Sequence, residues 1–124
     1  MHQTLVFPRA DNTIRMANNL SYCITHGIKN KLFAKECVEN DPEQAWEFNE
    51  SGQIKQIAED KCWTIVEKKD APKLYLRECD SEDSAQVFRF EAKQIKHEWE
   101  GNDYCLRTFE ENRVRLRKCV TTNF

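Results

Sequence analysis

One pattern occurs three times along this chain of 124 residues, at spacings of 41 and then 42 residues. Each copy begins with Gln-x-apolar-x-Phe, at residues 3–7, 44–48 and 86–90. An isoleucine with a basic neighbour follows, then a cysteine, and then an alternating run that ends in a second cysteine. Four landmarks in one order at one period indicate three copies of one structural unit, at residues 3–43, 44–85 and 86–124.

Within each unit the apolar residues are spaced mostly by two, which is typical of strands with one buried face. Two of the runs that end in the second cysteine, KLYLREC and VRLRKC, show this spacing clearly. The equivalent stretch KLFAKECVE could pass for a helix if taken alone, but its place in the repeat favours a strand. Each unit has room for four short strands, so we expect an all-β fold. Because the chain has three Gly and three Pro, we expect turns of Asn, Asp and Ser, with tight 3₁₀-type turns at 41–43 and 81–84.

Three units of four strands are too few for a propeller or an open solenoid. Closing them into a threefold barrel would remove exposed sheet edges. The third unit stops five residues after its second cysteine, so closure needs the N-terminal segment 3–7 in place of a fourth Gln-x-apolar-x-Phe. We therefore expect one domain, residues 1–124, with neighbouring termini.

The six cysteines form an even set with no Cys-x-x-Cys pair, which argues against a structural zinc site. An even count in a small domain favours disulfides and hence an oxidising compartment, secreted or in the secretory lumen. Six cysteines allow fifteen pairings. The repeat favours three local bridges, one per unit: Cys23–Cys37, Cys62–Cys79 and Cys105–Cys119.

Charge and composition exclude several functions. The 19 basic and 21 acidic residues are balanced, which argues against a nucleic-acid binder driven by net positive potential. No apolar run approaches the length of a membrane span, and the N-terminus lacks the apolar segment of a signal peptide, which we expect to have been removed. The histidines (His2, His26 and His97) have no nucleophile in a recognisable pattern, so we expect no enzyme, cofactor or metal.

The cysteine pairs with a following Gln-x-aromatic motif resemble ricin B-chain-type (R-type) β-trefoil lectin domains. The resemblance runs from Cys23 to Gln44-Ala45-Trp46, from Cys62 to Gln86-Val87-Phe88, and from Cys105 to Cys119 closed by Gln3. It therefore covers essentially the whole chain and implies a β-trefoil. The chain is also similar to lectin subdomains of some glycosyltransferases and to cysteine-rich domains of mannose-receptor-like proteins.

The resemblance implies a galactose-type site built from three positions in each unit, and this chain departs from all of them. The aspartate after the first cysteine is replaced by Thr25, Thr64 and Arg107. The aromatic platform two residues before the second cysteine is replaced by Lys35, Arg77 and Arg117. The asparagine before the Gln is replaced by Glu43, Ala85 and, through closure, His2. Without the carboxylate that accepts sugar hydroxyls, a neutral-galactose site of the usual kind is not expected.

Basic residues take the place of that site. On the strand at 113–118 the apolar Val114 and Leu116 face inward, so the arginines line the outside. Together with Arg107, the outward Arg115 and Arg117 make a cationic face where a sugar would lie. Arginine forks suit sulfate, carboxylate or phosphate groups. The alternative is a solvated strand face that protects against aggregation.

Two aromatic residues are further candidates. Trp99 lies in a polar stretch, where it could stack on a sugar or anchor a protein, or else be partly buried. Tyr75 alternates outward between two leucines near the sugar position of the second unit. The other large aromatic residues are interpreted as core: Trp46, Trp63 and Phe88.

Two functional hypotheses follow. The first is a secreted, non-catalytic, lectin-like module that binds glycans through altered sites, with anionic or sulfated glycans favoured because a basic residue occupies every platform position. The second is a protein–protein interaction module whose sugar sites are lost and which docks through the basic strand of the third unit and Trp99. The expected partners are glycans, glycoproteins or a protein receptor, with the chain a monomer or part of a larger extracellular protein.

Overall fold

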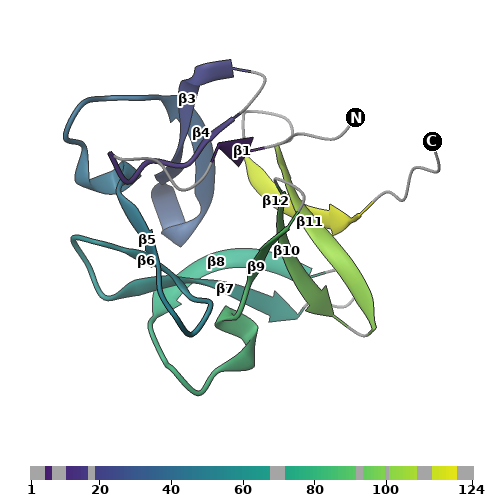
Figure 1. Ribbon diagram of the computed structural model, residues 1–124. Coiled ribbons are helices and arrows are strands. Elements are labelled where there is room, and N and C mark those ends of the chain that lie inside the picture. Colours follow the sequence, from purple (N-terminus) through teal and green to yellow (C-terminus); the bar gives the residue numbers. More distant parts are fainter. Residues whose placement is uncertain are drawn as a thin grey trace.

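The computed structural model describes residues 5–6, 11–16, 19–67, 72–91, 94–99, 101–108 and 113–119, and its regular structure there is almost entirely strand (Figure 1). The strands are β1 (Leu5–Val6), β2 (Arg15–Met16), β3 (Asn19–His26), β4 (Leu32–Glu36), β5 (Trp46–Phe48), β6 (Ile54–Gln56), β7 (Lys61–Glu67), β8 (Pro72–Glu78), β9 (Arg89–Glu91), β10 (Gln94–Trp99), β11 (Asn102–Thr108) and β12 (Val114–Lys118). The all-β prediction is confirmed.

The strands form three antiparallel sheets of four strands each. Their orders are β1-β2-β3-β4, β5-β6-β7-β8 and β9-β10-β11-β12, so each sheet is built from one stretch of chain. The expectation of four strands per repeat is therefore confirmed. The three sheets lie around a common centre (Figure 1).

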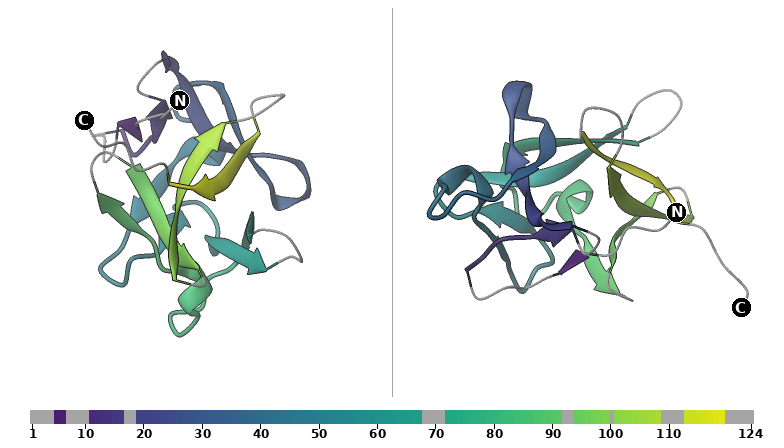
Figure 2. Two further views of the ribbon diagram at one scale, coloured as in Figure 1. Left: turned by 90° about the vertical axis from the view of Figure 1, so that its right-hand side faces the viewer. Right: turned by 90° about the horizontal axis from the view of Figure 1, so that it is seen from above.

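Each sheet ends in a long hairpin, and the three hairpins β3–β4, β7–β8 and β11–β12 together form what we call the hairpin cap. Within the cap, β12 contacts both β4 and β8 (Figure 2), and β4 contacts β8. An isolated bridge between Phe33 and Arg113 joins the first hairpin to the third. The second strands of the three hairpins therefore converge.

The core lies under this cap. Alternate residues of β4, β8 and β12 point into it and are at most 3% exposed: Leu32, Ala34, Leu74, Leu76, Val114 and Leu116. Trp63 is fully buried and meets Trp46 and Phe88 edge to face, with ring centroids 5.6 and 6.1 Å away. The interpretation of these three aromatic residues as core is confirmed.

The three predicted disulfides are present, one in each hairpin: Cys23–Cys37, Cys62–Cys79 and Cys105–Cys119. The bridged residues are 14, 17 and 14 positions apart in the chain. Closing a loop of that size stabilises the fold by about 3 kcal/mol in the chain-entropy model. Every cysteine is paired.

Three short 3₁₀ helices connect the strands: η1 (Ile28–Asn30), η2 (Pro42–Gln44) and η3 (Ser84–Gln86). Asp41 and Asp83 cap η2 and η3 by accepting backbone N–H groups at 2.9 and 2.8 Å. The helix η2 overlaps the turn predicted at 41–43, and η3 begins at the last residue of the turn predicted at 81–84. Both end on the Gln of their motif, whereas η1 was not predicted. Among the described residues no helix is long and apolar enough to cross a membrane.

The predicted closure of the barrel falls mostly outside the described residues. Leu5 and Val6 form β1, which pairs with Met16 and Arg15 of β2. Gln3 and the two chain ends lie beyond what the structure describes, so neighbouring termini stay a prediction.

Candidate functional site

The glutamine of each Gln-x-aromatic motif is a structural anchor. Gln44 is 2% exposed and stands at the end of η2. Its side-chain oxygen accepts the backbone N–H of Val38 at 2.8 Å. Its amide nitrogen donates to the carbonyl of Glu36 at 2.8 Å and to the hydroxyl of Thr25 at 3.0 Å. A buried polar side chain with all these bonds fixes the turn against the hairpin.

The second repeat carries the same network around Gln86. Its side chain bonds the N–H of Asp80, the carbonyl of Glu78 and the hydroxyl of Thr64 at 2.9, 2.8 and 3.1 Å. The Thr64 hydroxyl itself donates to the carbonyl of Cys62 at 3.0 Å. In both repeats, therefore, the group that replaces the sugar-binding aspartate is engaged within the protein.

A hollow of about 620 Å³ opens beside this network, between β7–β8, η3 and β10. We call it the repeat-2 hollow. It is lined by Thr64, Ile65, Val66, Arg77, Asp83, Ser84, Ala85, His97, Glu98 and Trp99. The second repeat supplies one wall and β10 of the third repeat supplies the other.

Two of the sequence candidates meet in the repeat-2 hollow. The Arg77 side chain is exposed on β8 and has no ion pair or hydrogen bond among the described residues. Trp99 is half-buried at the end of β10, with its ring edge-to-face on Tyr104 at 5.6 Å. Its indole nitrogen has no hydrogen-bond partner in the described part of the chain. Trp99 therefore lies on a strand and is partly buried, which was one of the two outcomes considered from sequence.

Two carboxylates that were not predicted to bind a ligand also line the repeat-2 hollow. Asp83 caps η3 through the N–H of Ala85, and Glu98 is exposed beside Trp99. Carboxylates accept hydrogen bonds from hydroxyl groups, and an indole face packs on a sugar ring. Asp41 and Asp83 each stand three positions before the Gln of their motif. This shared spacing was the sequence signal available for Asp83.

His97 forms the floor between the repeat-2 hollow and the core. It is 8% exposed, and its Nδ1–H donates to the carbonyl of Val87 at 2.8 Å. Burial holds the pKa of His97 below its ordinary value, against the opposing effect of the Val87 carbonyl, and the Arg89 charge adds to the lowering. The imidazole is therefore neutral at physiological pH.

This lowered pKa predicts a loss of stability in mild acid. His97 binds a proton more weakly in the folded chain than in the unfolded chain. Its contribution to the free energy of unfolding is therefore complete at pH values above the ordinary pKa of histidine and falls as the pH drops below that pKa. We expect the free energy of unfolding, measured by urea denaturation, to fall between pH 7.5 and pH 5.5. The His97→Gln variant should show a smaller fall, and an equal fall would contradict this assignment.

The first repeat has a hollow of its own, of about 460 Å³, but its polar groups are engaged. His26 is hydrogen-bonded on both ring nitrogens, to Gln56 at 2.7 Å and Asn30 at 3.0 Å, and lies 3.3 Å from the carboxylate of Glu43. The Lys35 ammonium lies 5.5 Å from the centre of the Phe33 ring. This hollow brings Lys35 together with Thr25 and Glu43, the residues at the other two galactose-type positions of the first repeat.

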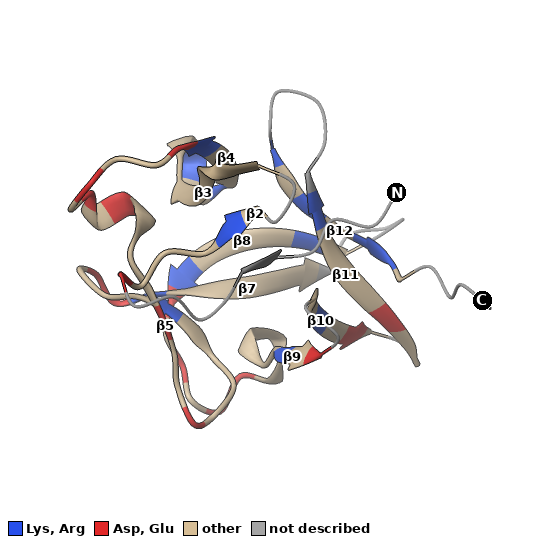
Figure 3. Ribbon diagram, turned by 45° about the horizontal axis from the view of Figure 1, so that its top comes forward, with Lys and Arg blue, Asp and Glu red and all other residues tan. Residues whose placement is uncertain are grey.

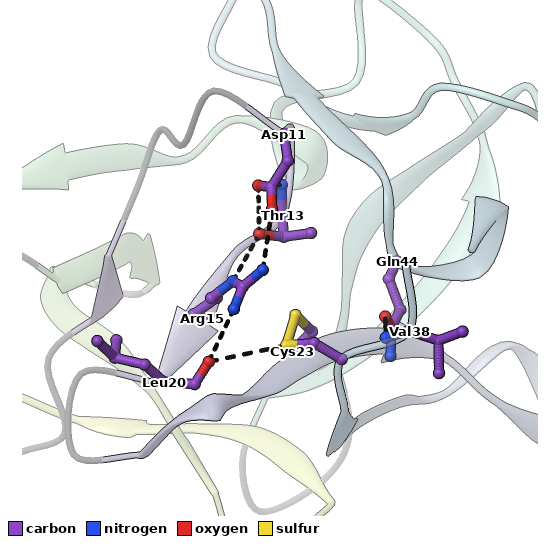
Figure 4. Close-up of polar contacts among 8 residues, drawn as sticks. Asp11, Thr13, Arg15, Leu20, Cys23, Val38 and Gln44 are labelled. Carbon is purple, nitrogen blue, oxygen red and sulfur yellow. Dashed lines mark hydrogen bonds and ion pairs between the residues drawn. A yellow bond between two sulfur atoms is a disulfide. The ribbon is translucent and has the colours of Figure 1, made fainter. Parts of the chain in front are cut away.

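A larger hollow of about 790 Å³ shares Val38, Asp41 and Gln44 with the first, and its cation is also satisfied internally (Figure 4). The Arg15 guanidinium donates to Asp11, Thr13 and the carbonyl of Leu20 at 2.9 to 3.0 Å. The hydroxyl of Thr13, with Arg15, lowers the pKa of Asp11 to about 2. An arginine held in this way offers little to a ligand.

The arginines of the third repeat occupy one hairpin face. Arg107 and Arg115 are directly opposite each other on β11 and β12, and Arg117 is exposed one pair further along, opposite Cys105. Val114 and Leu116 are buried, so the predicted alternation is confirmed. The corresponding sugar position would be completed by His2 and Gln3, which lie outside the described residues.

The register separates this face from Trp99. Trp99 pairs with Asn102, which shares a sheet face with the buried Leu106, whereas Arg107 points to the opposite face. A single docking surface that combines the third-repeat arginines with Trp99, as in the second sequence hypothesis, is therefore not supported.

Tyr75 lies next to the repeat-2 hollow rather than in its lining. It is half-buried on β8, directly opposite Thr64, between the buried Leu74 and Leu76. The predicted outward alternation of Tyr75 is thus confirmed, while a ligand contact stays a prediction.

The chain is similar to known lectins. A family model described as the ricin-type beta-trefoil lectin domain matches residues 2–88. The β-trefoil lectin of the Vibrio vulnificus hemolysin/cytolysin, solved with N-acetyl-D-lactosamine bound, superimposes with a TM-score of 0.69 at 16% identity, over 95% of this chain and 87% of that one.

The agglutinin of Abrus precatorius superimposes with a TM-score of 0.64 at 16% identity, over 86% of this chain and 47% of that one. This chain therefore spans about half the length of the agglutinin chain. No curated protein sequence matches. At these identities the structural likeness establishes the fold, which is a β-trefoil.

Proposed function

Since the chain belongs to the family of ricin-type β-trefoil lectin domains, we propose that it is a non-catalytic carbohydrate-binding module whose repeat-2 hollow binds a glycan with an anionic substituent. One observation carries the proposal. Arg77, Trp99 and two carboxylates line the same hollow, and the arginine has no partner among the described residues. Aromatic, anionic and cationic groups thus converge on a space of sugar size.

Each group has a separate role in this proposal. The face of Trp99 packs on the apolar side of a sugar ring. The carboxylates of Asp83 and Glu98 accept hydrogen bonds from ring hydroxyls, in place of the aspartate that Thr64 replaces. The fork of Arg77 binds a sulfate or carboxylate on the same sugar or its neighbour. Because the lining carries both signs of charge, sugar and substituent are recognised together.

The compartment of action in this proposal is extracellular or the secretory lumen, because three disulfides need oxidising conditions. Glycans and glycoproteins are the proposed partners. Binding through a single shallow site is expected to be weak and to gain strength from multivalent display.

A glycan array with neutral and sulfated members, probed at low and at physiological salt, tests the proposal. Sulfated or carboxylated glycans should bind more strongly than their neutral parents, and the difference should shrink as salt rises. Preference for neutral parents at both salts would contradict the role of Arg77. An array with no binding would contradict carbohydrate recognition and favour a protein partner, to be sought by a pull-down.

A further inference from the structure

We infer that Asn19 is an acceptor for an N-linked glycan and that Asn49, which has the same sequence motif, is not. The motif Asn-x-Ser, with x other than Pro, occurs at residues 19–21 and 49–51. It is the acceptor sequence for N-glycosylation in chains that enter the secretory pathway. The inference therefore rests on the compartment proposed above, and the surroundings of the two asparagines distinguish them.

Asn19 lies on the surface, and among the described residues only its side-chain oxygen is engaged. It stands at the start of β3 and is exposed, as are Leu20 and Ser21 after it. Its side-chain oxygen accepts the backbone N–H of Ser21 at 3.1 Å, whereas its side-chain nitrogen has no hydrogen-bond partner in the described part of the chain. A sugar on this nitrogen would therefore break no hydrogen bond of the described residues.

The backbone around Asn19 is held in place by bonds that leave its side-chain nitrogen untouched. The carbonyl of Leu20 accepts a hydrogen bond from the Arg15 guanidinium at 3.0 Å, and the Leu20 side chain points away from Arg15 (Figure 4). The carbonyl of Ser21 accepts the N–H of Cys37 at 2.8 Å. The acceptor motif is thus ordered at the surface of the first repeat.

Asn49 uses both of its side-chain polar atoms within the protein. Its oxygen accepts the backbone N–H groups of Ser51 and Gln53 at 3.0 and 2.9 Å, and its nitrogen donates to the side-chain oxygen of Gln53 at 2.9 Å. Gln53 is 5% exposed and itself donates to Gln86 and to the carbonyl of Asp80. A sugar ring on the Asn49 nitrogen would have to lie against this buried network. A chain modified there would not complete the loop, so we expect the folded protein without it.

The transfer step is a substitution at the anomeric carbon of the incoming oligosaccharide. The Asn19 side-chain nitrogen attacks C1 of an oligosaccharide carried on a lipid diphosphate, which is the co-reactant. A C–N bond forms, the bond from C1 to the diphosphate oxygen breaks with its electron pair leaving on that oxygen, and the nitrogen loses one proton. Asn19 keeps its side-chain carbonyl oxygen, so the bond from the Ser21 N–H is retained.

A glycan on Asn19 leaves the repeat-2 hollow open. The strand β3 packs mainly against β2, β4 and η2, whereas the hollow is lined mainly by residues of β7, β8, η3 and β10. In Figure 3, β3 lies away from β9 and β10. Asn19 is not part of the lining. The modification and the proposed ligand site therefore occupy separate parts of the surface.

The test expresses the chain behind a cleavable secretion leader in cultured mammalian cells and uses the secreted, disulfide-bonded protein. Digestion with peptide N-glycosidase in H₂¹⁸O converts each glycosylated asparagine to an ¹⁸O-labelled aspartate, which peptide mapping then locates. We expect the label at Asn19 and not at Asn49. Asn19→Gln should remove the glycan from the intact mass, whereas Asn49→Gln should keep it.

Thermal unfolding tests the reason for the difference, with protein made without glycans in the bacterial periplasm. Asn49→Gln should lower the melting temperature by at least about 4 °C, because its bonds to Ser51 and Gln53 are lost. Asn19→Gln is the matched control and should stay within about 2 °C of the wild type, because one exposed bond is lost. Equal melting temperatures for the two variants would overturn the structural distinction between the motifs.

A secreted and folded chain without label at Asn19 would overturn the acceptor assignment. Label at both asparagines to the same extent would overturn the exclusion of Asn49. Neither result depends on the glycan array. Array binding by a chain that carries no glycan would keep the proposed function and remove the modification site, whereas a glycosylated Asn19 with a blank array would do the reverse.

Discussion

Replacing Gln86 by leucine is expected to lower the free energy of unfolding by about 3 to 5 kcal/mol, because each buried polar group left without a partner costs about 1 to 3 kcal/mol. The change removes the bonds to Asp80, Glu78 and Thr64, and also the one that Gln53 donates at 2.9 Å. Leucine fills similar volume, so the loss reports the hydrogen bonds rather than a cavity. Urea denaturation at neutral pH measures it.

The matched control for Gln86→Leu is Glu82→Ala in the same loop. Glu82 is exposed, and within the described part of the chain only its backbone N–H is hydrogen-bonded, to Asp80 at 3.0 Å. Its replacement should change the free energy of unfolding by less than about 0.5 kcal/mol. A loss below about 1 kcal/mol for Gln86→Leu would show that water replaces the network and that the Gln anchor is not structural.

Reversing the charge of Arg77 is expected to weaken binding of a sulfated glycan at least about tenfold, because a charge-assisted hydrogen bond of about 1.5 to 3 kcal/mol is replaced by repulsion. The neutral parent glycan should lose much less, since Trp99 and the carboxylates are unchanged. Arg77 is exposed without a partner among the described residues, so stability should be nearly unaffected. Calorimetric titration of Arg77→Glu with both glycans measures the difference.

Lys55→Glu serves as the control for Arg77→Glu, because it makes the same change in net charge on β6, outside the lining of the repeat-2 hollow. It should leave both affinities within about twofold of the wild type. If Arg77→Glu weakened the sulfated and neutral glycans equally, the arginine would be supporting the hollow's shape rather than binding the anionic substituent.

Much of the fold could be predicted because the sequence contains three copies of one unit, and equivalent positions can be compared among them. The alternation in KLYLREC and VRLRKC identified strands that KLFAKEC alone left ambiguous. Local cysteine spacing then selected one pairing of the fifteen. The closing strand could be predicted because the third unit lacks a following Gln-x-apolar-x-Phe segment, which residues 3–7 would supply. Gln3 of that segment lies outside the described residues. The helix η1 gave no sequence pattern to recognise, and the equivalent connections of the other two repeats lie outside the described residues.

The candidate site was only partly predictable, because its lining comes from two repeats. Arg77 and Trp99 are 22 positions apart in sequence, and each was considered within its own unit. Their meeting depends on how β10 packs against η3, which no local pattern encodes. A ligand-binding role for Asp83 could not be predicted for a different reason. An aspartate that caps a turn has the same sequence pattern whether or not it borders a hollow.

The cationic face of the third repeat could be predicted from sequence. The alternation of its last strand identified Arg115 and Arg117 as outward residues, and the resemblance to ricin-type lectins placed Lys35 and Arg77 at positions equivalent to Arg117. Neither could show that β4, β8 and β12 converge, since convergence is a property of the closed threefold arrangement.

The central claim is that a glycan binds in the repeat-2 hollow against Trp99, and a ¹H–¹⁵N NMR titration of the indole signals tests it most directly. Trp46 and Trp63 are at most 1% exposed, and the Trp46 indole donates to the carbonyl of Ile24 at 2.9 Å, so both should be insensitive to a ligand at the surface. Trp99 is assigned with the Trp99→Phe variant. Addition of the array's best sulfated glycan should move the Trp99 signal in a saturable way and leave the other two in place. Saturable binding by calorimetry with an unmoved Trp99 signal would contradict the claim.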